Sequence, residues 1–102
     1  MAVLHKNALR QIQKIHKLSQ RLNGKAKSLH EKKLLSLMRE HIDEIGSLYK
    51  SKRSHYLVEV GDLIILCFEI LIENKRSIDD TINLCIKRYN KKITELLRKQ
   101  KA

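Results

Sequence analysis

Two carboxylates, Glu59 and Asp62, stand three residues apart within the apolar segment Val58–Leu63. The surrounding residues are mostly Leu, Ile and Val, and the stretch is long enough for a helix, so both acids are predicted on an otherwise apolar helix. A buried carboxylate without a partner is costly or becomes protonated, so an acid in such a place is normally held by a cation. That cation is predicted to be either a metal ion or a Lys or Arg side chain.

A second polar group precedes these acids on another predicted helix. Its members share an arc of roughly 100°, away from the Leu and Ile face of that helix: Glu40, Asp43, Glu44 and Ser47. If the two helices are antiparallel neighbours, their acidic stripes face each other, and facing carboxylates repel unless hard cations lie between them. Carboxylate ligands suit Mg²⁺ or Mn²⁺, and such ions in enzymes usually serve a phosphate.

Two simpler interpretations of these acids stay open. In these, Glu40, Asp43 and Glu44 form a solvated helix face, and Glu59 and Asp62 form salt bridges with Lys or Arg of the last helix. A transition-metal site is not favoured: His55 and Glu59 have a suitable spacing, but no second His stands at ligand spacing beside them.

The apolar residues recur with helical periodicity and predict four helices, over residues 4–22, 28–50, 55–74 and 78–99. Local signals support these ends, because Asn23-Gly24 is a typical helix stop and Ser28, Ser54 and Ser77 stand at predicted N-cap positions. The chain contains no Pro and three Gly. The sequence therefore predicts a single all-α domain over residues 1–102.

Four helices joined by short turns predict a four-helix bundle of antiparallel neighbours. The apolar positions of the fourth helix are expected to face inward: Ile78, Ile82, Cys85, Ile86, Tyr89, Ile93 and Leu97. The third helix is apolar on nearly every side, which is more than three partner helices in so small a domain could cover. We therefore expect a homodimer that packs through the third helix.

The charge is strongly basic, with 22 Lys and Arg against 11 Asp and Glu and a net charge of +11. A stripe of basic residues follows the first predicted helix: Lys6, Arg10, Lys14, Lys17 and Arg21. This stripe is either a solvated face or a surface that tracks a nucleic-acid backbone, which makes nucleic-acid binding an alternative function.

The remaining composition indicates a cytoplasmic protein without a membrane segment. The N-terminus lacks the apolar core of a signal peptide, and the longest uncharged apolar run, residues 63–68, is too short to span a bilayer. Cys67 and Cys85 fall at apolar helix positions and are interpreted as reduced core thiols.

Taken in the order in which they follow along the chain, the two acidic segments resemble the paired motif of the MazG-like nucleotide pyrophosphohydrolases. That motif reads Glu-Glu-x-x-Glu followed by Glu-x-x-Asp, and here Asp43-Glu44-Ile45-Gly46-Ser47 is followed by Glu59-Val60-Gly61-Asp62. The resemblance covers about residues 30–98, because residues 77–80 and 87–92 are similar to the family's closing helix with its Asn and basic residues.

The resemblance implies an all-α dimer or tetramer that hydrolyses a nucleoside triphosphate to the monophosphate and pyrophosphate, with Mg²⁺ or Mn²⁺ as cofactor. Carried over by position, Glu44, Glu59 and Asp62 would be catalytic metal ligands, and Asp43 would stand for the first acid of the motif. The resemblance also implies that a nucleotide contacts the fourth helix, at Lys87, Asn90 and Lys91.

One position departs from the motif, because Ser47 stands where the family has a metal-binding glutamate. A serine hydroxyl is neutral and short, so it would reach a metal only through water. This departure keeps a second hypothesis open, in which the chain is a non-catalytic MazG-like module that binds a nucleotide or a protein.

Overall fold

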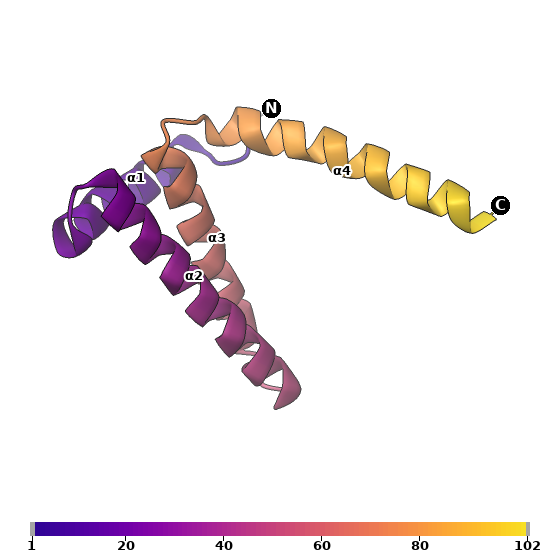
Figure 1. The fold of residues 1–102 in the computed structure, drawn as a ribbon, viewed down its shortest axis with the longest axis horizontal. Coiled ribbons are helices and arrows are strands. Elements are labelled where there is room, and N and C mark those ends of the chain that lie inside the picture. Colours follow the sequence, from indigo (N-terminus) through magenta and orange to yellow (C-terminus); the bar gives the residue numbers. More distant parts are fainter. Residues whose placement is uncertain (1, 102) are drawn as a thin grey trace.

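The computed structural model describes residues 2–101, which form four helices and, within that range, no strand (Figure 1). The helices are α1 (Lys6–Asn23), α2 (Lys27–Lys50), α3 (Tyr56–Glu73) and α4 (Ile78–Lys101). The predictions of an all-helical fold and of four helices are therefore confirmed.

Helices α2 and α3 form an antiparallel hairpin, and they pack together more extensively than any other pair (Figure 1). Leu34 of α2 and Leu66 of α3 are buried. Helix α1 crosses the end of the hairpin where α2 begins and α3 ends (Figure 1). The second and third helices are thus neighbours, as expected, and their acidic segments lie beside each other.

The hydrophobic core lies where α1, the second half of α3 and the first turn of α4 meet. Its buried members are Ile12, Phe68 and Ile78, surrounded by partly buried apolar residues: Val3, Leu4, Leu9, Leu71, Ile72 and Ile82. The backbone N–H of Val3 donates to Asp79 Oδ1 at 2.5 Å, which ties the start of the chain to the start of α4.

The structure differs from the expected bundle in the placement of α4, which projects away from the other three helices (Figure 1). Ile78 is buried and Ile82 is partly buried, but four later positions that were expected to face inward are more than half exposed: Ile86, Tyr89, Ile93 and Leu97. The turn between the helices contains Lys75 with φ of 55°, and it directs α4 outward. The apolar stripe of α4 therefore has no partner within the described part of the chain.

The helix ends follow the sequence signals in part. Ser77 Oγ accepts a hydrogen bond from the backbone N–H of Asp80 at 3.2 Å, as an N-cap does. Ser28 has no such role, because α2 begins one residue earlier and Ala26 stands at its N-cap without a side-chain hydrogen bond. Glu31, which stands three residues after Ser28 as in a capping box, accepts a hydrogen bond from Asn74 and not from the start of α2.

Gly24 ends α1 with φ of 98° and ψ of 146°, a conformation that side chains with a Cβ atom strongly disfavour. We expect Gly24→Ala to destabilise the protein by about 1–3 kcal/mol in urea denaturation. Gly46 is the matched control, because it lies inside α2 with open space around its Cα, and Gly46→Ala should stabilise by about 0.5–1 kcal/mol. Equal effects of the two substitutions would contradict the assigned turn.

Candidate functional site

The α2–α3 hairpin brings two of the predicted site residues, Glu44 and Glu59, together with a histidine, His41. One ligand atom from each of the three lies within 4.8 Å of the others. Glu59 is buried at the start of α3 and contacts His41 Nδ1 through its Oε2 atom, while its Oε1 atom lies 3.6 Å from His55 Nε2. We call His41, Glu44 and Glu59 the hairpin cluster.

The other predicted metal ligands are not part of this cluster. Asp43 and Asp62 are exposed, and neither belongs to a group of three ligands within residues 2–101. Ser47 is exposed as well. The sequence interpretation also expected Lys or Arg as the only alternative to a metal, whereas the ion pairs that Glu59 makes are with histidines.

Sequence analysis missed His41 as a possible ligand, although a signal was present. His41 precedes Glu44 by three residues, so the two side chains share one face of α2. The sequence around His55 offers no second histidine at ligand spacing, and His55 itself is largely exposed.

The predicted nucleotide contacts on α4 lie apart from the hairpin cluster. Lys87, Asn90 and Lys91 are exposed and line a shallow depression of about 370 Å³ on α4. Since α4 makes no contact with α2 in the described chain, these residues and Glu44 are not brought together within one copy.

A second cluster, which sequence analysis did not identify, lies where α1 crosses the hairpin. It consists of His16 of α1, His30 of α2, and Glu69 and Glu73 of α3, and we call it the junction cluster. His16 Nδ1 lies 3.2 Å from Glu69 Oε1, and His16 Nε2 lies 2.7 Å from Glu73 Oε2. His30 Nδ1 lies 3.2 Å from the same Glu73 oxygen, and all four side chains are at most 5% exposed.

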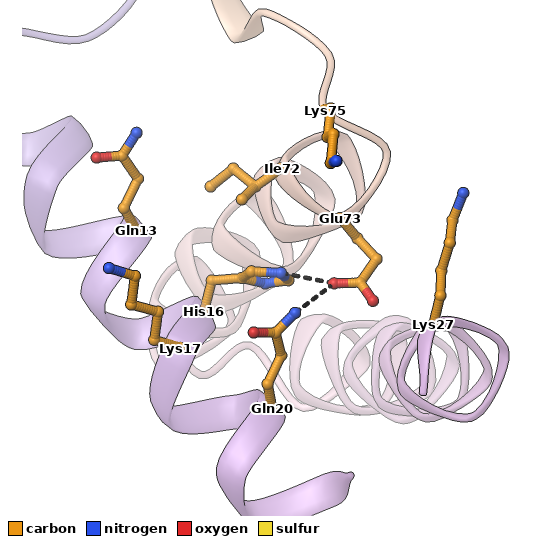
Figure 2. Close-up of a pocket in the computed structure, with 8 residues that line it drawn as sticks. All are labelled: Gln13, His16, Lys17, Gln20, Lys27, Ile72, Glu73 and Lys75. Carbon is orange, nitrogen blue, oxygen red and sulfur yellow. Dashed lines mark hydrogen bonds and ion pairs between the residues drawn. The ribbon is translucent and has the colours of Figure 1, made fainter. Parts of the chain in front are cut away.

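Two further polar side chains of α1 support the junction cluster. Ser19 Oγ and His30 Nε2 are hydrogen-bonded at 2.8 Å, and Gln20 Nε2 donates to Glu73 Oε2 at 3.0 Å (Figure 2). Burial by itself would raise the pKa of Glu73. Its contacts with His30, Gln20 and His16 outweigh that effect and lower the pKa of this carboxyl below its usual value.

A pocket of about 590 Å³ opens beside the junction cluster, and His16 and Glu73 are part of its wall (Figure 2). The remaining lining residues are mostly polar or basic: Gln13, Lys17, Gln20, Lys27, Ile72 and Lys75. The lysines are exposed, and Lys17 points away from Glu73 (Figure 2). The cluster is thus buried but lies next to solvent-accessible space.

Comparisons of the chain with protein-family models, with curated proteins and with solved structures give no significant match. None of the helices within residues 2–101 combines the length and apolar character that crossing a bilayer requires. Cys67 and Cys85 are unpaired and partly buried, and burial raises the pKa of the Cys67 thiol.

We expect Glu73→Gln to destabilise the protein by about 1–3 kcal/mol at pH 7 in the presence of a chelator, because the buried network loses its negative charge and gains an amide NH2 group among other donors. The pKa of Glu73 is lowered in the folded chain, so its contribution is complete above the usual carboxyl pKa and is lost as the pH falls through the lowered value. The difference between the variant and the wild type should therefore shrink below about pH 4.

The control for this substitution is Glu95→Gln, which changes an exposed carboxyl of α4. It should leave the urea midpoint nearly unchanged at both pH values. If Glu73→Gln behaved like Glu95→Gln, the junction cluster would not hold the three helices together.

Proposed function

We propose that this chain is a MazG-like nucleotide pyrophosphohydrolase that uses Mg²⁺ or Mn²⁺. The observation that carries the proposal is the approach of Glu44 and Glu59, which come from neighbouring antiparallel helices in the order that the motif requires. Each of the two carboxylates has a ligand atom within 4.8 Å of the other and of the His41 imidazole, which is a spacing that one bound ion could bridge.

The donor atoms of the hairpin cluster fit a divalent ion. Glu44 and Glu59 supply carboxylate oxygens, and His41 supplies an imidazole nitrogen, which Mn²⁺ accepts more readily than Mg²⁺ does. The ion, when bound, would polarise the phosphates, activate a water and neutralise charge on the pyrophosphate leaving group. Asp62, three residues after Glu59 on α3, is exposed and outside the cluster, and it would have to turn toward the ion to serve as a fourth ligand.

The side chains around Glu59 fix its position. Its contacts with His41 and His55 leave this buried carboxylate little rotational freedom, so it is preorganised for a ligand. Glu44 is exposed and free to adjust. Ser47 adds no charge, so the ligand set is one carboxylate smaller than the family motif.

The test is pyrophosphate release from a panel of canonical and modified nucleoside triphosphates, with Mg²⁺ and Mn²⁺ compared. We expect turnover that is faster with Mn²⁺, and Glu44→Gln should lower it by roughly a hundredfold because an exposed ligand is lost without harm to the fold. Glu40→Gln, one turn earlier on the same exposed face, is the matched control and should keep nearly full activity. No pyrophosphate and no nucleotide-induced rise in Tm would refute the proposal.

The non-catalytic alternative keeps the fold and the nucleotide but not the reaction, and Ser47→Glu separates the two. A non-catalytic module that lacks one ligand should gain Mg²⁺ affinity from the new carboxylate without turnover. An active enzyme adapted to serine should change little in rate or become slower.

We propose further that two copies associate through the third and fourth helices. The exposed stripe of α4 repeats at helical spacing, and α3 also keeps Leu57, Val58 and Ile64 exposed. A second copy is the occupant that fits, because each copy offers both an apolar α4 and an incompletely covered α3. Such pairing would also let Lys87, Asn90 and Lys91 of one copy approach the hairpin cluster of the other.

Light scattering coupled to size exclusion should give twice the 12.0 kDa mass of one chain at micromolar concentration. Ile93→Lys places a charge in the exposed apolar stripe and should shift the protein to monomer. Lys92→Ala, an exposed neighbour outside that stripe, should leave the mass unchanged. A wild-type monomer would rule out this association.

A further inference from the structure

We propose that the junction cluster is a binding site for one divalent transition-metal ion, with His16, His30 and Glu69 as ligands and Glu73 as the carboxylate that orients them. This site is separate from the hairpin cluster, shares no residue with it and does not depend on the proposed function. Its ligands come from three helices, so the ion would join α1, α2 and α3.

The donor atoms already lie at nearly the spacing that coordination requires. Zn²⁺ binds His nitrogen and carboxylate oxygen at about 2.0–2.2 Å, so tetrahedral ligands are about 3.3 Å apart. Ligand atoms of His16, His30 and Glu69 lie within 4.8 Å of one another. Glu73 Oε2 lies 2.7 Å from His16 Nε2, whereas Glu69 lies at Nδ1 of the same ring, so Glu73 holds the imidazole in place from outside the ligand group.

His30 gives independent support for a ligand at this place. Its side chain is fully buried, and its Nδ1 atom has no hydrogen-bond partner, because the approach to Glu73 lacks hydrogen-bond geometry. Its other nitrogen, Nε2, is hydrogen-bonded to Ser19. The tautomer in which Nε2 donates to Ser19 leaves a lone pair on Nδ1, and that is the atom through which His30 would bind an ion.

The chemistry of the donors selects the class of ion. Two imidazoles with one carboxylate suit Zn²⁺, Mn²⁺, Fe²⁺ or Co²⁺, whereas Mg²⁺ and Ca²⁺ prefer oxygen ligands alone. Two buried carboxylates also match the charge of a divalent ion. The adjoining pocket supplies a route from solvent and room for a water on the ion.

The hairpin cluster also contains a histidine, so the experiment removes it first. In a His41→Gln background, we expect one equivalent of Co²⁺ to bind, with the visible absorption bands of a four- or five-coordinate ion, and Zn²⁺ to raise Tm. Adding His30→Gln should abolish the absorption and weaken binding by roughly tenfold or more. Adding His5→Asn, which removes an exposed imidazole but retains an N-cap side chain, should change neither.

A milder variant keeps the test informative if His30→Gln does not fold. Ser19→Ala removes the hydrogen bond that orients His30, together with the one that Ser19 accepts from Asn23, and it should weaken Co²⁺ binding by roughly tenfold. In the wild type, Zn²⁺ should shift the ring ¹⁵N resonances of His16 and His30. Unchanged resonances, or Co²⁺ absorption that is the same with and without Ser19→Ala, would show that the cluster is a hydrogen-bonded network only.

Discussion

The junction cluster is the interaction on which the arrangement of α1, α2 and α3 depends. Four buried ionisable side chains from three helices can be accommodated only if each meets a partner, since a single unpaired carboxylate there would cost several kcal/mol. His16 contacts both Glu69 and Glu73, and Glu73 also contacts His30. A shift of any helix by one residue would break these contacts, so the cluster fixes the register of the three helices.

The register at the junction sets the geometry at the far end of the hairpin. Because α2 and α3 are antiparallel helices, the position of His30 beside Glu73 also determines which residues face each other about three to four turns away. There Glu44 and His41 of α2 meet Glu59 of α3. Helix α4 is outside this constraint, because its core contacts lie near its start, where Ile78 and Ile82 meet the core and Asp79 accepts from the Val3 amide.

Local patterns in the sequence were sufficient for the helices and for two of the three residues of the hairpin cluster. Helical periodicity, Gly24 and the Ser77 cap act over a few residues, so they are readable without tertiary information. The pairing of Glu44 with Glu59 followed from the short connection between two helices. The junction cluster was not predictable in this way, because His16 and Glu73 lie 57 residues apart on different helices and no local spacing links them. The direction of α4 depends on one turn and was missed for the same reason.

Histidine, rather than lysine or arginine, meets the buried carboxylates of this basic chain. Within residues 2–101 every Lys and Arg is exposed, while Glu59, Glu69 and Glu73 all pair with imidazoles. A long cationic side chain would have to lose its hydration inside a thin core, whereas an imidazole is compact and can stay neutral while it donates one hydrogen bond. An imidazole can also bind a metal through a lone pair, which an ammonium or guanidinium group lacks. Histidine beside these acids keeps their burial tolerable. It also gives both clusters an imidazole, which is a side chain that can bind a metal ion.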